Sequence, residues 1–213
     1  MVDFDEICIT NANRQLHALQ GLTGKKKAEV MADRLRSINP RADVRAHGIF
    51  VDKNTAEDLL AERPDYVIDA IDHVTSKCHL LARCKELDIP VVTATGSGGR
   101  MDPTQIVVAD LAKTTRDPLA RSIRGILRDK HGFPTEGEFG IPAVYSTEPH
   151  SNPKELTYDK GQGFRCVCPQ GQNPYFTCDN RNMIYGNASF VTGTFGLVCA
   201  SVVVRQISEQ ASK

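Results

Sequence analysis

The sequence predicts an α/β protein built around a doubly wound, mostly parallel sheet. Segments with helical periodicity alternate with short runs rich in β-branched residues, an alternation typical of βαβ units. One of these apolar runs, at residues 65–72, ends in acidic residues. A chain of 213 residues is long enough for one sizeable α/β domain with an appended lobe and too short for two full domains.

The chain opens with FDEICIT (residues 4–10), which we interpret as the carboxyl end of a strand running into a polar turn. The segment GKKKAEVMADRLRSINP (24–40) predicts a helix that ends at Asn39-Pro40. Ala28, Met31, Leu35 and Ile38 are expected on one face of this helix. ADVRAHG (42–48) is then expected to form a short strand.

The next four elements repeat the alternation. TAEDLLAER (55–63) predicts a helix capped by Thr55, and DYVIDAID (65–72) predicts a buried strand that ends in acids. TSKCHLLARCKELD (75–88) predicts a helix, and IPVVTATG (89–96) the following strand.

The pattern changes from about residue 98. We expect a strand at 106–109, then a helix capped by Asp117 with Pro118 in its first turn. Residues 131–188 are rich in Gly, Pro and Asn, so they are expected to be irregular apart from one strand at PAVYST (142–147). A final helix is expected from about residue 189 to 208.

Composition limits the location and partners of the chain. The 26 basic and 26 acidic residues balance, so any nucleic acid must be bound by a local patch. The seven cysteines without a signal peptide indicate a reducing compartment, and we expect a cytoplasmic protein with mitochondrial association as an open alternative. The apolar run at 189–204, of 16 residues, is shorter than a bilayer span, which predicts a buried helix and no stable membrane insertion.

Charged residues cluster where predicted strands and helices begin or end. Because strand ends meet at one crevice of a doubly wound sheet, these residues could form an ATP site. An acid would bind ribose, two cations would bind phosphates, and a second acid would bind Mg²⁺. The candidates are Asp3, Asn11, Arg14, Lys27 and Asp72. Taken singly, each residue is better explained by ordinary capping or solvation.

Taken together, these residues follow a known motif order. The pairs Asp3-x-Asp5, Asn11-x-x-Arg14, Gly24-x-x-Lys27 and Asp69-x-x-Asp72 resemble the adenylating enzymes of the ThiF and MoeB superfamily, which are related to ubiquitin-activating enzymes. The segment GSGGRMDPTQIVVADLAKTTRDPLARSIRGILR, with CITNANRQLHAL and VIDAID, more specifically resembles the tRNA threonylcarbamoyladenosine dehydratases.

This resemblance implies a Rossmann-like, ThiF-type single domain over residues 1–213, with a nucleotide-binding sheet in 1–110 and family-specific helices and an irregular lobe in 111–213. It implies ATP-dependent cyclisation of a modified adenosine in tRNA through an acyl-adenylate, by a homodimer. Asp3 would bind ribose, Asn11, Arg14 and Lys27 would contact phosphates, and Asp5 would belong to the same nucleotide-binding set. Asp72 would hold Mg²⁺, with Arg14, Lys27 and Asp72 as the catalytic set, while Asp69 would support the strand end.

Family members carry a strand and a glycine-rich turn before the equivalent of Asp3, so the resemblance implies an N-terminally truncated domain. Two alternatives to the dehydratase stay open. The chain could be a non-catalytic partner or fragment that pairs with a complete homologue. It could also be a nicotinamide-dependent dehydrogenase, although it lacks G-x-G-x-x-G.

Further candidates for function are weaker. Cys166, Cys168 and Cys178 could bind metal, but no C-x-x-C pair is present and Cys178 is a poor candidate for a reactive thiol. His17 and His73 lie close to the proposed site in sequence, although a packed or exposed histidine is the more ordinary interpretation. Residues that could bind tRNA phosphates are Lys25, Lys26, Arg100, Arg121, Arg124 and Arg128, with a solvated helix face as the alternative for the last three.

Overall fold

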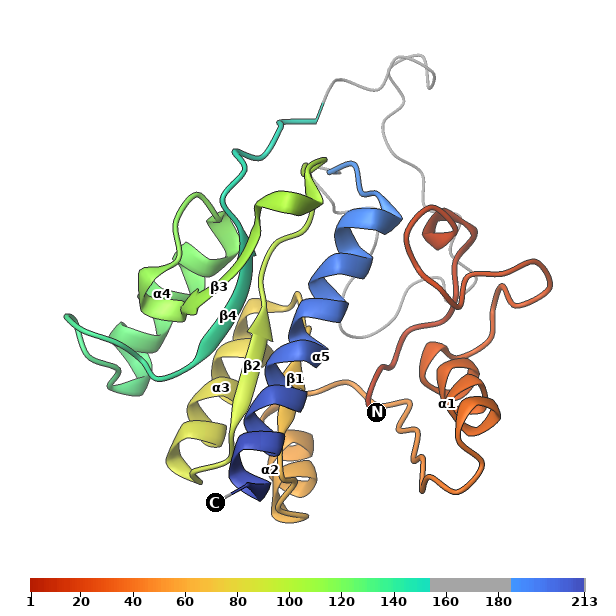
Figure 1. Cartoon of the computed structure of the whole chain (residues 1–213), viewed down its shortest axis with the longest axis horizontal. Coiled ribbons are helices and arrows are strands. Elements are labelled where there is room, and N and C mark those ends of the chain that lie inside the picture. The colour runs from red at the N-terminus through yellow and green to blue at the C-terminus, as the bar shows by residue number, and fades with distance from the viewer. Residues whose placement is uncertain (154–184, 213) are drawn as a thin grey trace. The chain divides into compact units, whose positions relative to one another are not determined.

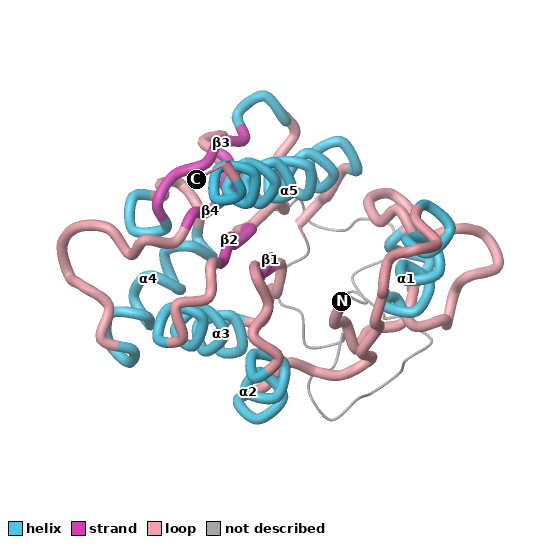
Figure 2. Tube along the Cα trace, turned by 60° about the horizontal axis from the view of Figure 1, so that its bottom comes forward, coloured by secondary structure: helices cyan, strands magenta, loops and turns pink. Residues whose placement is uncertain are grey.

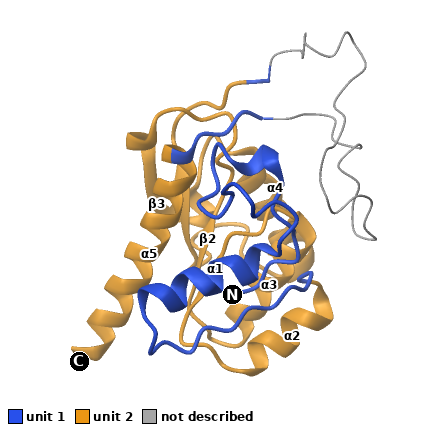
Figure 3. Ribbon diagram, turned by 90° about the vertical axis from the view of Figure 1, so that its right-hand side faces the viewer, with its two compact units in different colours: residues 1–51, 152–189 blue, residues 52–151, 190–213 orange. Residues whose placement is uncertain are grey.

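The computed structural model describes residues 1–153 and 185–212. The chain divides into two compact units, residues 1–51 with 152–189 and residues 52–151 with 190–213 (Figure 3). The sequence predicted a single domain with two regions that meet at residue 110. This boundary differs from the two units and stays a prediction.

The second unit contains a four-stranded sheet with the order β1-β2-β4-β3. Strands β1 (Val67–Asp69), β2 (Val91–Ala94) and β4 (Pro142–Ser146) are parallel neighbours, and β3 (Ile106–Asp110) pairs antiparallel with β4. The predicted mostly parallel sheet is confirmed. Because β1, β2 and β4 run in one direction, the loops that follow them leave the sheet at the same edge.

Helices cover both faces of this sheet, as Figures 1 and 2 show. On one face α3 (Val74–Glu86) packs against α4 (Pro118–His131), with α2 (Lys53–Ala61) beside α3. On the other face lies α5 (Ser189–Ala211). Buried aliphatic side chains such as Leu81, Ile123 and Leu127 join the helices to the sheet. Single-turn helices η2 (Pro103–Gln105) and η3 (Leu111–Lys113) flank β3.

The first unit contains α1 (Lys27–Ile38) and the short helix η1 (Ile9–Asn11). The prediction of strands at 4–10 and 42–48 is wrong, because the structure assigns no strand to either segment. Val2 forms a single bridge with His47 and Glu6 a single bridge with Lys26, because neither segment has a longer partner to extend the ladder. The helix predicted at 24–40 is confirmed, and on its apolar face Leu35 and Ile38 are 36% and 67% exposed.

Strand β1 differs from its prediction as a buried strand over 65–72. Only Val67–Asp69 pair with a neighbour, and Ile68 is 51% exposed because β1 lies at the edge of the described sheet. A run of apolar residues does not distinguish a central strand from an edge strand. Ile71 and Asp72 therefore belong to a loop at the carboxyl end of β1.

Of the two predicted helix caps, the one at Asp117 is confirmed and the one at Thr55 is wrong. The cap of α4 is confirmed, because the carboxylate of Asp117 accepts a hydrogen bond from the amide of Ala120. The cap of α2 is Asp52 instead of Thr55: the Asp52 carboxylate accepts from the amides of Asn54 and Thr55, and the Thr55 hydroxyl accepts from the Asp52 amide. This capping box has Asp first and Thr third, so helix α2 begins two residues earlier than expected.

Helix α5 is longer and less buried than predicted. It spans 23 residues, which makes it long and apolar enough to cross a membrane by length and composition alone, and only 22% of its most apolar window is buried. The face formed by Val191, Phe195, Cys199 and Val202 is buried. The expected buried helix is therefore buried along one side, because a single helix on one face of a sheet packs with one side only.

Candidate nucleotide site

Asp69 holds the loop that follows β1 from inside the protein. Its carboxylate pairs with the Lys77 ammonium at 2.7 Å and accepts from the Thr93 hydroxyl at 2.7 Å. The amide of Ile71 donates to the other carboxylate oxygen, and Lys77 donates to the carbonyl of Ile71. The side chains of Asp69 and Lys77 are fully buried. This network sets the backbone from Asp69 to Ile71, so Asp69 supports the strand end as the sequence indicated.

Lys77 was missed as a candidate by the sequence analysis, although a signal was present. It lies on α3 among buried neighbours, in the stripe that also contains Leu81 and Cys84. A lysine at a core position needs a buried acid, because an unpaired buried charge is very costly. Asp69, which lies inside the apolar run that precedes α3, is such an acid.

Asp72 projects from the same loop in a different environment. It is exposed, and its carboxylate has no hydrogen-bond or ion-pair partner within residues 1–153 and 185–212. His73, next in the chain, caps α3 by accepting from the amide of Ser76. This structural role accounts for the place of His73, while the Asp72 carboxylate is available to a ligand.

A second loop leaves the same edge of the sheet after β2. The buried Asp117 carboxylate accepts from the Thr95 hydroxyl at 2.8 Å and from the Gly96 amide at 3.0 Å, besides capping α4. A side chain at Gly96 would place its Cβ 3.3 Å from Asp117 Oδ2. Asp117 therefore fixes the amino end of α4 to the glycine-rich turn at 96–99, a role that capping signals alone did not predict.

In the first unit, Lys27 is held by Asp5. The Lys27 ammonium lies 2.6 Å from a carboxylate oxygen of Asp5, and the Lys27 amide donates to the Asp5 carbonyl. The amide of Asp5 in turn donates to the Asp3 carboxylate at 2.9 Å. The lysine side chain is only 9% exposed. The structure thus links three predicted site residues, Asp3, Asp5 and Lys27, at the amino end of α1.

Asn11 and Arg14 lie on the turn that includes η1. Asn11 is buried, and its side-chain oxygen accepts from the Cys8 amide at 3.1 Å. The Arg14 guanidinium donates to the carbonyl of Thr10 and to the side chain of Asn13. Asn11 therefore shapes this turn, and Arg14 provides a positive charge on it.

His17 lies close to Lys27 and shares its environment. Burial and then the nearby charge of Lys27 lower the pKa of His17, so the imidazole is neutral near pH 7. Its Nε2 is buried without a hydrogen-bond partner among the described residues. His17 thus adds an unpaired polar atom beside the lysine that is expected to bind phosphate.

The residues present fit ATP and Mg²⁺ chemically. The amino end of α1 has no side-chain cap, and Lys27 adds a cation there, an arrangement that favours phosphate. Asp72 provides one accessible carboxylate, as Mg²⁺ needs when phosphates supply further ligands. Asp72 belongs to the second unit and Arg14 and Lys27 to the first, so their proximity stays a prediction.

The basic residues proposed to bind tRNA phosphates differ in exposure and in their partners. Arg100 is only 2% exposed and donates to the Arg116 carbonyl, so its expected contact with tRNA is wrong. Lys26 is paired with Glu6 at 3.3 Å.

Four cysteines in the described part of the chain are buried, namely Cys8, Cys78, Cys84 and Cys199. Burial raises the pKa of Cys78 and Cys199 to about 11 and that of Cys84 to about 12. These thiols are protonated at neutral pH and unsuited to nucleophilic attack. Cys166, Cys168 and Cys178 lie outside the described residues.

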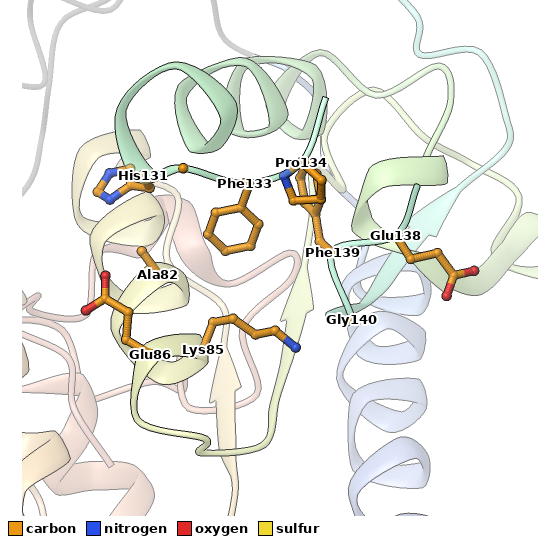
Figure 4. A pocket seen from close by; sticks show the side chains of 10 residues that line it. Ala82, Lys85, Glu86, His131, Phe133, Pro134, Glu138, Phe139 and Gly140 are labelled. Atoms are coloured by element: carbon orange, nitrogen blue, oxygen red, sulfur yellow. The ribbon is translucent and has the colours of Figure 1, made fainter. Parts of the chain in front are cut away.

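The cavity shown in Figure 4 lies at the edge of the sheet opposite to the one from which the Asp72 loop leaves. Its volume is about 450 Å³, and Lys85, Phe133, Phe139 and Gly140 contribute to its lining. Lys85 is near the end of α3, just before β2, and Gly140 precedes β4. The cavity is therefore at the amino ends of the strands, away from Asp72. A second cavity, of about 570 Å³, includes Lys25 and Lys26 but not Lys27.

Comparisons with known proteins cover the whole chain. A model described as the ThiF family matches residues 1–213. The chain is 39% identical over 214 residues to tRNA threonylcarbamoyladenosine dehydratase of Haemophilus influenzae, covering 100% of this chain and 77% of the relative.

Solved structures give the same result. The crystal structure of the E. coli tRNA N6-threonylcarbamoyladenosine dehydratase, TcdA, in complex with AMP matches with a TM-score of 0.81 and 39% identity, over 100% of this chain and 76% of that chain. The complex of the same enzyme with ATP matches with a TM-score of 0.81 and 38% identity, over 99% and 75% of the two chains.

Proposed function

Because the chain belongs to the ThiF family, we propose that it is an ATP-dependent tRNA threonylcarbamoyladenosine dehydratase. The observation that carries this proposal is similarity along the entire chain to dehydratases of that name. The E. coli relative has been solved with AMP and with ATP, which supports adenylation as the chemistry.

The reaction has two steps. The threonyl carboxylate attacks the α-phosphate of ATP and forms an acyl-adenylate with release of pyrophosphate. A nucleophile on the same modified base then attacks the acyl carbon, closes the ring and releases AMP. A carboxylate is a poor electrophile until it carries a good leaving group, and a tethered nucleophile acts at high effective concentration. The enzyme has to position and stabilise charge, and no protein nucleophile is required.

The residues have the following proposed roles. Asp3 binds ribose, while Asn11, Arg14 and Lys27 contact phosphates. Asp5, which neutralises Lys27 at 2.6 Å, orients this lysine until phosphate replaces it as the partner. Asp72 holds Mg²⁺, which would neutralise phosphate charge when bound.

The proposed partners are tRNA and a second copy of the chain, and the proposed compartment is the cytoplasm. A homodimer is supported by an apolar stripe on the exposed side of α5. Phe190, Leu197, Val204 and Ile207 are 50%, 74%, 62% and 43% exposed. The first three are seven residues apart and Ile207 follows Val204 by three, which places them along one side of the helix and suits packing against another helix.

The deciding experiment incubates the 213-residue protein with Mg²⁺, ATP and tRNA carrying linear threonylcarbamoyladenosine. We expect the nucleoside to lose one water and AMP to appear in equal amount, as measured by mass spectrometry of digested tRNA. Lys27→Met and Asp72→Asn should lower the rate by roughly 100-fold or more, because each removes a charge that stabilises the transferring phosphate.

Lys53→Met is the matched control, because Lys53 is an exposed lysine at the start of α2. Absence of AMP formation by a folded protein would contradict the proposal. If that protein also associated with a complete dehydratase, the non-catalytic partner alternative would be supported instead.

A further inference from the structure

Helix α4 presents three arginines along one side, and we propose that this arginine face, Arg121, Arg124 and Arg128, is the surface that binds the tRNA phosphate backbone. The inference rests on the proposed function, since it assumes that tRNA is the substrate. The sequence left a solvated helix face as the alternative, and the contacts of these side chains decide between the two.

The three guanidinium groups are close together and lack acidic partners. Within the described residues none of them forms an ion pair with a carboxylate, and the spacing i, i+3, i+7 puts them on one stripe. The pKa of Arg124 is lowered by burial and then by the charges of Arg128 and Arg121, while Asp117 opposes this weakly. A solvated face with mixed charges would not show this mutual repulsion, which a bound polyanion would relieve.

Two of the arginines are held in position before any ligand binds. The Arg124 guanidinium donates to the Thr114 hydroxyl. Arg128 donates to the carbonyl of Pro134, and its guanidinium carbon lies 5.2 Å from the centre of the Phe139 ring. Each of these contacts uses one N–H, and a guanidinium has five, so further donors remain for phosphate. Arg121 is exposed and free to adjust.

The position of the arginine face also suits a substrate of this size. Asp117 fixes the amino end of α4 to the turn after β2, so Arg121 lies near the sheet edge from which the Asp72 loop projects. From Arg121 to Arg128 the helix rises about 10 Å, a length over which a nucleic-acid strand presents several charges. A tRNA lying along α4 would thus reach the edge where Asp72 is expected to act.

The test measures tRNA affinity for the full chain over a series of salt concentrations. In Arg121→Gln the slope of log affinity against log salt should fall by about 1, and in a triple Gln variant by about 2 to 3, with at least tenfold weaker binding at low salt. Glutamine keeps an amide donor for the bonds to Thr114 and Pro134. Arg121→Lys should retain most of the slope.

Arg205→Gln is the matched control, because Arg205 is exposed on α5, at the other face of the sheet. ATP binding by every variant is measured in parallel and should not change. An unchanged salt slope in Arg121→Gln and the triple variant overturns the arginine face while leaving the dehydratase proposal intact.

Loss of AMP formation in the unaltered chain would instead count against the dehydratase itself. Sedimentation with vesicles of phosphatidylserine and phosphatidylcholine tests whether the arginine face binds an anionic lipid surface instead of tRNA. Loss of vesicle binding in the triple variant, with tRNA binding retained, would also overturn the inference.

Discussion

At the scale of the residue, Asp69 and Lys77 show how charge can be buried in order to shape a loop. Both side chains are inaccessible, and the pair is satisfied by Thr93 and by the backbone of Ile71. Removing one partner leaves the other as an unpaired buried charge. The loop that presents Asp72 therefore depends on a pair that does not itself contact solvent.

We predict that Lys77→Met and Asp69→Asn each lower the free energy of unfolding by about 3 to 5 kcal/mol. Urea unfolding followed by circular dichroism measures this loss. Arg36→Met is the control, since it breaks an exposed pair with Asp33 and should cost under about 1 kcal/mol. Equal losses in Lys77→Met and Arg36→Met would show that the buried pair has no special structural role.

The buried thiols lead to a second prediction at this scale. Because burial raises the pKa values of Cys78, Cys84 and Cys199 well above neutrality, these thiols should resist iodoacetamide in the native protein at pH 8 and react once urea is added. Peptide mass spectrometry identifies each modified site. Rapid native labelling of Cys84 would contradict the burial of that side chain.

At the scale of the element, Asp117 joins a helix cap to a strand-end turn. Asp117→Ala removes the cap of α4 and also leaves the Thr95 hydroxyl and the Gly96 amide without their acceptor. Asp52→Ala removes a more accessible cap of α2, which should cost about 0.5 to 2 kcal/mol.

We expect Asp117→Ala to cost roughly 1 to 3 kcal/mol more than Asp52→Ala, because buried donors are left unsatisfied. Thermal and urea unfolding of the two variants provide the comparison. Similar losses would mean that Asp117 acts as a cap alone and does not organise the turn at 96–99.

At the scale of the whole molecule, the exposed stripe of α5 is expected to mediate association of two copies. Leu197→Glu would place a charge at its most exposed apolar position, 74% accessible, and should shift the protein to monomers at micromolar concentration. Sedimentation velocity measures this shift. Arg205→Glu adds a carboxylate to the same helix outside the stripe and should leave the oligomer unchanged; dissociation by both variants would point to a general charge effect.

Much of the second unit could be predicted from the sequence. The strands at 89–96, 106–109 and 142–147 and the Asp117 cap were found because apolar runs, Asp-Pro and periodicity act locally. The strands expected at 4–10 and 42–48 failed, because a strand requires a partner that no local pattern reveals. The sequence also did not show that Arg100 is buried or that α5 exposes one side.

The sequence by itself determined the family motifs, the alternation of strands and helices, and the identity of the charged residues. Only the tertiary structure decided which charges are partners. Asp5 neutralises Lys27, Asp69 is buried with Lys77, and Asp72 is left accessible. The physical reason is that composition and spacing specify which groups are present, whereas burial and pairing depend on residues that meet only after the chain has folded.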